Sequence, residues 1–345
     1  MGKIDFRTQV EDGLKELFST EQKAALTGES RELIKLCAKV IIGSGKRFRP
    51  RLFDVTYAIY GGKDSRDVLD MGLALELFHQ ALLVHDDVID QDLTRNGQLN
   101  IIGEYKKDKD YDHGNTPEAM AILAGDYLLN LVNKIIIDSK QLTNDQKIVV
   151  IRLFIETFNS VIFGQQLDSL NIDNLMSDIT ASDLMNINIK KTASYTTILP
   201  MRLAAYIRKL EVPELAKIDK FAQDLGLYYQ LVNDYSDYFS LSTEDVSPGK
   251  LSDYKVGKIT YIYKIAKDKL KGKDLSFFTT NFSNSELTSS DMNKISILLK
   301  KYSIDEFAKD EASAFLTKAS DELEALAISK DSKLQLTALL ENLKI

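Results

Sequence analysis

The sequence has little cysteine and little proline, and each scarcity excludes a class of protein. The single cysteine, Cys37, rules out an internal disulfide and suits a reducing compartment; its apolar surroundings in the sequence place it in the core. With only 5 prolines in 345 residues and few alternating Val, Thr and Tyr, an all-β fold is disfavoured. The net charge of −7 argues against nucleic acid as the main partner, so an anionic substrate would need a local cluster of bases and metal.

The sequence also shows no pattern typical of a targeting segment or of a linker between domains. The start of the sequence, residues 1–5, lacks the apolar region of a signal peptide, and no apolar run approaches the length of a membrane span. We therefore expect a cytoplasmic protein without a transmembrane segment. Length alone would suggest about two domains. Because helical periodicity continues without a linker, we instead predict one all-α domain over residues 1–345.

The strongest chemical signal is the stretch His-Asp-Asp-Val-Ile-Asp at residues 85–90. It follows an apolar run that covers nearly every angle of a helix, so we expect this helix to be buried. Asp86 and Asp90 are four residues apart and share a face, with Asp87 beside them. Such carboxylates repel one another and lose hydration, and a divalent cation is the simplest compensation. The alternative is that the acids lie just past the buried segment, in water.

A second stretch, residues 226–237, has the same form. An apolar helical run is followed by oxygen ligands at i, i+1 and i+4, namely Asn233, Asp234 and Asp237. Because these ligands are all oxygens, the pattern favours Mg²⁺ over zinc or copper. Mg²⁺ usually completes its shell with substrate phosphates. The residues alone therefore predict a diphosphate held between two acidic helix ends.

Basic residues that could bind this anion lie in three places. In the segment 45–50, Gly45 would allow close backbone approach, and Lys46 and Arg49 could contact phosphate; the alternative is a solvated basic turn. His79 lies two helical turns before the first acidic stretch on the same face, which favours a functional role over that of a core histidine. After the second stretch, Lys250 and Lys258 each follow a glycine, as in a phosphate clamp.

Hydrophobic periodicity and capping signals predict the helices. They are expected over residues 31–42, 51–60, 66–91, 116–138, 144–169, 181–209, from 213 to the second acidic stretch, and through most of 258–345. Ser30 is expected to cap the first of these. The polar segment 96–115 is predicted to be a loop.

Several motifs together resemble the trans-isoprenyl diphosphate synthases, or polyprenyl synthetases, of medium or long product length. In order, they are GKRFRP, ELFHQALLVHDDVID, AGDYLL, GQQLD, KTASY, YYQLVND and GK…D…GK, from about Gly45 to Lys258. The resemblance implies an all-α, isoprenoid synthase-type helical bundle around a deep apolar cavity. It also implies a homodimer, with a heterodimer as the alternative, and peripheral membrane contact for product release.

The implied reaction is Mg²⁺-dependent condensation of isopentenyl diphosphate with an allylic diphosphate, giving an all-trans polyprenyl diphosphate. The implied ligands of three Mg²⁺ ions are Asp86, Asp87, Asp90, Asn233, Asp234 and Asp237. The residues implied around the allylic diphosphate are Arg95, Lys191, Thr192, Gln230, Lys250 and Lys258. Those implied for isopentenyl diphosphate are Gly45, Lys46, Arg49 and His79. The implied catalytic residues are Asp86, Asp90, Arg95 and Lys191.

Two residues depart from the family pattern and keep other functions open. Asn96 stands where a second arginine is usual, and Asn233 stands where an aspartate is usual. An amide oxygen can bind Mg²⁺ but carries no net charge, and one lost charge-assisted contact costs about 1.5–3 kcal/mol. An Asn at the start of the second stretch also resembles the class I terpene cyclases, although the match fails at Leu241. The alternatives are therefore a cyclase-like or other-acceptor prenyl transferase, and a weakly active accessory subunit.

Product length is partly encoded just before the first acidic stretch. In the family that the chain resembles, the residues four and five positions before the first Asp face the product tunnel, here Leu82 and Ala81. The small Ala81 leaves the tunnel open, and Phe78 could form a deeper floor. The resemblance therefore implies a product of C20 or longer.

Overall fold

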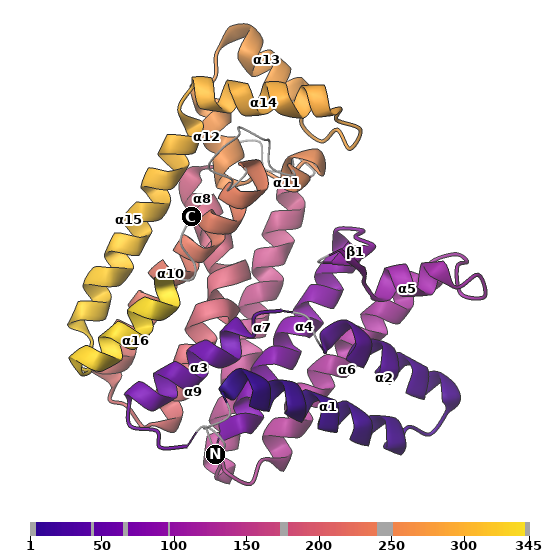
Figure 1. Ribbon diagram of the computed structural model, residues 1–345, viewed down its shortest axis with the longest axis vertical. Helices are drawn as coiled ribbons and strands as arrows, with labels where there is room; N and C mark the ends of the chain where they lie inside the picture. Colours follow the sequence, from indigo (N-terminus) through magenta and orange to yellow (C-terminus); the bar gives the residue numbers. More distant parts are fainter. Residues whose placement is uncertain are drawn as a thin grey trace. The chain divides into compact units, whose positions relative to one another are not determined.

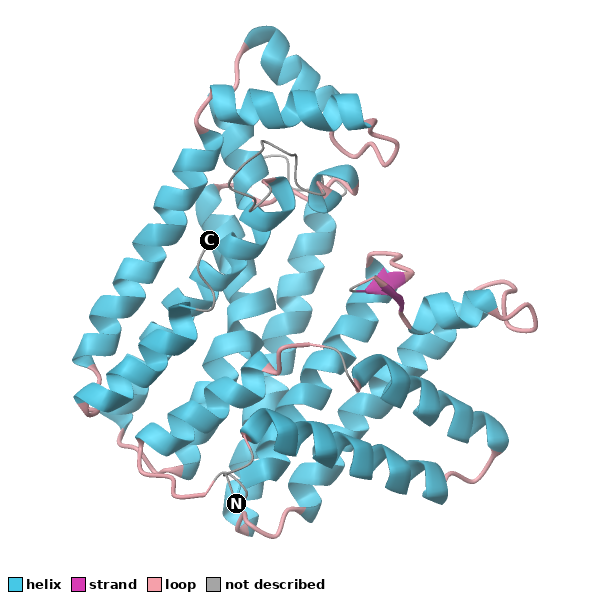
Figure 2. Cartoon of the chain, in the orientation of Figure 1, coloured by secondary structure: helices cyan, strands magenta, loops and turns pink. Residues whose placement is uncertain are grey.

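The protein is all-α, as predicted from its sequence (Figures 1 and 2). A computed structural model describes residues 5–42, 45–64, 68–95, 97–172, 179–239 and 251–341. Within these ranges the strands are β1 (Thr94–Arg95) and β2 (Gln98–Leu99), which pair antiparallel.

The chain divides into two compact units. Unit 1 comprises Met1–Leu153 with Leu203–Arg208, and unit 2 comprises Phe154–Arg202 with Lys209–Ile345. The helices α7 (Asn144–Ile172) and α9 (Leu199–Ile207) each contribute residues to both units. The expectation of one domain over the whole chain stays a prediction.

Unit 1 is built around α4, whose apolar residues cover the whole circumference of the helix. Its helices are α1 (Phe6–Ala24), α2 (Gly28–Ile41), α3 (Phe48–Ile59), α4 (Leu69–Ile89), α5 (Ile101–Lys107) and α6 (Thr116–Asp138). The most extensive helix–helix contact in unit 1 is that between α4 and α6. It depends on Gly125, because a Cβ there would collide with the His85 ring. His85 therefore packs against α6.

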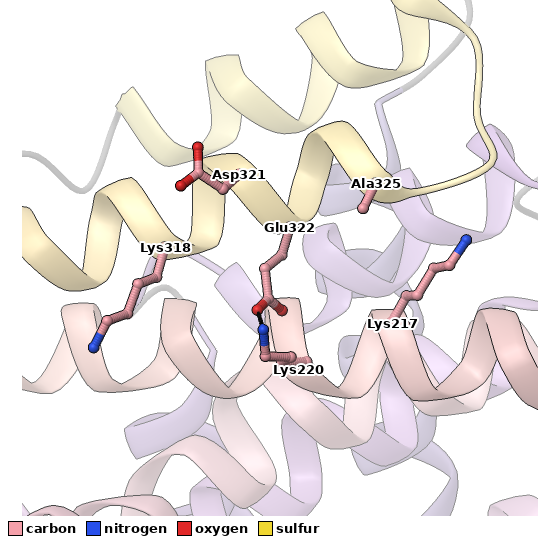
Figure 3. Close-up of a pocket in the computed structure, with 6 residues that line it drawn as sticks. All are labelled: Lys217, Lys220, Lys318, Asp321, Glu322 and Ala325. Carbon is pink, nitrogen blue, oxygen red and sulfur yellow. Dashed lines mark ion pairs between the residues drawn. The ribbon is translucent and has the colours of Figure 1, made fainter.

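Unit 2 is built around α10, which packs against α15 and η2. Besides its part of α7, the unit begins with α8 (Ala181–Asn188), the π-helix η2 (Ile189–Ile198) and α10 (Val212–Tyr238). It continues with α11 (Ser252–Lys255), α12 (Tyr261–Lys269), α13 (Gly272–Thr280), α14 (Ser289–Lys301), α15 (Ile304–Ala325) and α16 (Lys330–Glu341). A shallow groove along α10 and α15 is spanned by the ion pair of Lys220 with Glu322 (Figure 3).

Most predicted helices are present, and three details differ from the prediction. The predicted helix over 181–209 contains a π-helical segment, η2, which apolar periodicity does not reveal. The predicted loop 96–115 contains α5, whose N-cap Asn100 accepts a hydrogen bond from the Gly103 amide at 2.9 Å. The cap of α2 is Thr27 rather than Ser30, so that helix begins earlier than predicted.

Two helices are more apolar than the sequence reading allowed. By length and composition alone, α6 and α7 as far as Leu170 are long and apolar enough to cross a membrane, a test that core helices of soluble proteins also pass, so the two apolar runs are longer than expected from the sequence. Both helices also carry large apolar side chains on the surface, among them Ile137, Ile148 and Ile155. Because a core helix would bury such side chains, they mark surfaces suited to an apolar partner.

Candidate active site

The first acidic cluster lies at the end of α4, and its three carboxylates have different surroundings. Asp87 is buried, with 4% of its surface exposed, whereas Asp86 and Asp90 are half-buried. The Asp87 Oδ1 accepts hydrogen bonds from the Arg95 Nε, at 2.9 Å, and from the Arg95 Nη2. Arg95 reaches it because β1 and β2 fold the chain back after α4. The Arg95 Nη2 also lies 3.9 Å from the Asp86 Oδ2.

The Arg95 guanidinium therefore serves as an internal counter-charge for this cluster. Burial raises the pKa of Asp87, and hydrogen bonds from Arg95 oppose that shift. The carboxylate that is already paired with Arg95 is least able to turn toward a cation. Asp86 and Asp90, one helical turn apart and partly exposed, are the better-placed oxygen ligands.

The basic segment before α3 contains a structural residue that the sequence reading missed. Arg47 is buried in left-handed backbone (φ 50°), and it donates to the Glu76 Oε1 at 2.7 Å and to the Ile41 carbonyl at 2.8 Å. The Gln80 Nε2 also donates to the Glu76 Oε1, at 2.9 Å. The available signal was Glu76 itself, because an acid in an otherwise apolar run needs a buried partner.

The segment's predicted ligands differ in exposure. Lys46 is exposed, whereas Arg49 is buried with 6% of its surface exposed, and Gly45 adopts a positive φ of 89°. Burial, together with the positive charges of Arg49 and Arg95, holds the pKa of His79 well below its ordinary value. His79 is therefore neutral near pH 7 and could offer a phosphate a hydrogen bond but no charge.

The second acidic cluster lies at the end of α10, and within the part of the chain that the structure describes it has no arginine partner of this kind. Asn233 is exposed, whereas Asp234 is buried with 3% of its surface exposed. The Gln230 Nε2 donates to the Asp234 Oδ1 at 2.7 Å, and the Thr192 hydroxyl donates to the Gln230 Oε1 at 2.8 Å. Burial and the nearby carboxylate of Asp253 raise the pKa of Asp234 to about 7.

Asp237, the last member of this cluster, holds the start of α11. Its carboxylate accepts hydrogen bonds from the backbone amides of Ser252 and Asp253, both at 3.0 Å, and from the Ser252 hydroxyl. Burial, followed by the charge of Asp253, raises the pKa of Asp237. The predicted residues Asn96 and Lys250 lie outside the described residues.

Two predicted lysines meet at a carboxylate to which no role was assigned. The Lys191 Nζ lies 2.6 Å from the Asp168 Oδ2, and the Lys258 Nζ lies 3.9 Å from the same oxygen. Lys258 is also 3.4 Å from the Asp253 Oδ1. Asp168 is buried, with 5% of its surface exposed. The GQQLD motif was the only sequence signal for it.

The backbones of α7 and η2 lie close together beside Asp168 and Lys191. Gly164 lies one turn before Asp168 on α7, and a Cβ there would come within 2.5 Å of the Lys191 backbone nitrogen. Glycine thus lets η2 approach α7. The π-helix then presents the consecutive residues Lys191 and Thr192 to Asp168 and Gln230.

Hard oxygen donors are present in both clusters, but they do not form a complete metal cage. Among the described residues, no three carboxylate, imidazole or thiol side chains gather around one point. Mg²⁺ commonly binds through one or two carboxylates and completes its shell with water and substrate phosphates. The donors here fit a cation that arrives with a phosphorylated substrate.

The matched motifs agree with a comparison against known families. A profile described as polyprenyl synthetase matches residues 31–297, more than three quarters of the chain. The chain belongs to the polyprenyl synthetase family. It is accordingly a transferase, as the motifs implied.

Individual relatives and solved structures match between 63% and nearly all of the chain. The geranylgeranyl diphosphate synthase of Sulfolobus acidocaldarius is 24% identical over 312 residues, which cover 90% of this chain and 89% of the relative. The farnesyl diphosphate synthase of Micrococcus luteus is 30% identical over 222 residues, covering 63% and 70%. A solved Corynebacterium glutamicum geranylgeranyl pyrophosphate synthase, complexed with isoprenyl diphosphate and magnesium, superposes with a TM-score of 0.87 at 21% identity over 99% of both chains.

Proposed function

We propose that this polyprenyl synthetase condenses isopentenyl diphosphate with an allylic diphosphate to give an all-trans polyprenyl diphosphate of C20 or longer. The observation that carries the proposal is the set of four cationic or donor groups that two helices, η2 and α10, and one loop of unit 2 bring to one cluster. They are Lys191, Lys258, Thr192 and Gln230. Together with the paired acids of the two clusters, these groups suit a diphosphate that binds with divalent cations.

In this proposal the protein stabilises the leaving diphosphate. The carbon–oxygen bond of the allylic substrate breaks, and Lys191, Lys258 and Arg95 donate to the oxygens on which negative charge develops. When bound, Mg²⁺ held by Asp86, Asp90, Asp234 and Asp237 supplies further charge neutralisation, and three ions are expected. The double bond of isopentenyl diphosphate then forms the new carbon–carbon bond, and a proton passes to the departing diphosphate.

The second substrate is assigned to the other basic group. We propose that Gly45, Lys46, Arg49 and His79 bind the diphosphate of isopentenyl diphosphate. Arg49 supplies a buried guanidinium and Lys46 an exposed ammonium group. His79, held neutral by its surroundings, supplies a hydrogen bond without adding charge.

Product length is proposed from α4. Ala81 is fully buried and small, and Phe78, one turn earlier, is also buried. The absence of an aromatic side chain at Ala81 favours a product of C20 or longer, with Phe78 as a deeper limit. The names of the relatives given above include both a farnesyl and a geranylgeranyl diphosphate synthase, so the product length of this chain needs its own measurement.

The decisive experiment incubates the purified protein with Mg²⁺, labelled isopentenyl diphosphate and farnesyl diphosphate, then separates the dephosphorylated products by length. A series ending at one prenol of C20 or longer is expected. Hydrocarbon release without elongation would instead indicate a cyclase-like reaction. Consumption of neither substrate, with recovery of activity on adding a partner synthase, would indicate an accessory subunit.

We further propose a homodimer in the cytoplasm. The exposed Ile148, Ile155 and Ile162 are spaced seven residues apart on α7, the spacing of one helix stripe, and α6 adds Ile137. The free Cys37 is buried, which suits a reducing compartment. Light scattering that gives the mass of one chain would contradict the dimer. The same apolar helices could make peripheral membrane contact for product release.

A further inference from the structure

We propose that Asp168 is a positioning residue that holds the ammonium groups of Lys191 and Lys258 at a fixed spacing for the allylic diphosphate. This inference rests on the proposed function and deepens it. Asp168 would touch neither substrate nor metal and would act through the two lysines.

The geometry singles out this carboxylate. One oxygen, Oδ2, lies 2.6 Å from the Lys191 Nζ and 3.9 Å from the Lys258 Nζ. The two lysines come from different elements, η2 and the segment after α11. Lysine is a flexible side chain with considerable rotamer entropy, and a shared buried counter-ion removes that freedom before substrate arrives.

The burial of these groups also fits a positioning role. Asp168 is only 5% exposed, so solvent screens its attraction for the two lysines little, and Asp253 beside Lys258 brings the whole group close to neutrality. Lys191 and Lys258 themselves are only partly buried, so each can turn a proton toward an incoming anion. The second carboxylate, Asp253, lies 3.4 Å from the Lys258 Nζ.

A second observation lies one turn away. Gln165 and Asp168 are three residues apart on α7 and so share a face. The Gln165 Nε2 is buried and has no hydrogen-bond partner among the residues that the structure describes. Since buried donors are rarely left unpaired, this amide marks the same face of α7 as a place where an acceptor binds.

The test is steady-state kinetics of Asp168→Asn with each substrate varied in turn. If Asp168 positions the lysines, the KM for the allylic diphosphate rises or kcat falls by about 10–100-fold, because small misplacements of binding groups are costly. The KM for isopentenyl diphosphate changes by less than about 3-fold. If Asp168 only neutralised charge, removing it would add net positive charge and tighten the allylic diphosphate; that result would overturn the proposal.

The matched control is Asp219→Asn. Asp219 also pairs with a cation of unit 2, Arg202, at 2.5 and 2.9 Å. It lies 15 residues before Asp234 on α10, about 22 Å along the helix axis. We expect it to leave both KM values unchanged. Equal effects of the two variants would contradict a role specific to Asp168.

Asp168→Glu separates positioning from folding. It keeps the charge but moves the carboxylate by one methylene, so we expect normal circular dichroism with a raised allylic KM. A wild-type KM in this variant would overturn the proposal even if Asp168→Asn failed to fold. Wild-type protein that consumes neither substrate would refute the proposed function, whereas an active wild type with unaffected variants would refute only this inference.

Discussion

The ends of α4 and α10 carry acidic clusters of the same form, yet the middle residues of the two clusters have different hydrogen-bond partners. Asp87 and Asp234 are both buried next to an exposed or half-exposed first ligand. Asp87 is paired with the Arg95 guanidinium, whereas Asp234 accepts a neutral Gln230 amide and faces the charge of Asp253. The comparison shows that the spacing i, i+1, i+4 places the oxygen atoms on one helix. Residues elsewhere in the chain then decide whether the charge of each carboxylate is compensated.

The largest effect should follow removal of the two outward acids of the α4 cluster. Asp86→Asn with Asp90→Asn should lower kcat/KM by about 10³-fold, because several kcal/mol of transition-state stabilisation from metal binding are lost. The matched control, Asp110→Asn with Asp112→Asn, changes two exposed acids of the segment before α6 and should leave activity near wild type. Retention of activity by the first pair would show that the α4 cluster is not a metal site.

Replacing the middle residues one at a time tests the comparison directly. Asp87→Asn should destabilise the protein by about 1–3 kcal/mol, because it leaves the half-buried Arg95 without its counter-charge. Asp234→Asn should be neutral or stabilising at pH 8 without Mg²⁺, because an amide keeps the Gln230 contact and removes repulsion by Asp253. Urea unfolding in EDTA measures both. Equal destabilisation by the two substitutions would show that Asp87 and Asp234 do not differ in how their charges are compensated.

A substitution at the first position of the α10 cluster should strengthen Mg²⁺ binding rather than weaken it. Asn233→Asp adds a charge at an exposed position, where it costs little desolvation. We expect the Mg²⁺ concentration for half-maximal activity to fall by about tenfold, the equivalent of one charge-assisted contact of about 1.4 kcal/mol. Asn188→Asp, a change outside both clusters, is the control. An unchanged Mg²⁺ requirement would mean that residue 233 does not ligate the metal.

The smallest effect concerns His79 and acid stability. Because its pKa is lowered by burial, Arg49 and Arg95, the folded state binds fewer protons than the unfolded state below about pH 6.5. Its contribution to stability is therefore complete above pH 6.5 and is lost as the pH falls. His79→Gln should remove up to ~1.4 kcal/mol per pH unit of that slope between pH 6.5 and 5. Parallel curves for the two proteins would show that His79 is not held neutral.

Much of the fold could be predicted because helix signals are local. Apolar periodicity predicted α4, α6, α7 and α10. The sequence Thr-Pro-Glu at 116–118 predicts a helix that is capped by Thr116, and the structure differs by one residue, since the N-cap of α6 is Asn115. The π-helix η2 could not be predicted this way. The segment η2 approaches α7 at Gly164, and a contact with a residue 25 or more positions away leaves no mark on local periodicity.

The sequence by itself determined the chemistry of this protein. The spacing of its acids and the hard-oxygen donor set predicted a diphosphate held with divalent cations, because residue type and helical spacing are properties of the chain alone. The transferase activity and the family followed from the resemblance of its ordered motifs to a known family. Only the tertiary structure decided which charges are paired. It assigned Arg47 to Glu76, Arg95 to Asp87, and two lysines to Asp168. The strength of a charge depends on burial and on neighbours distant in sequence, and folding brings those together.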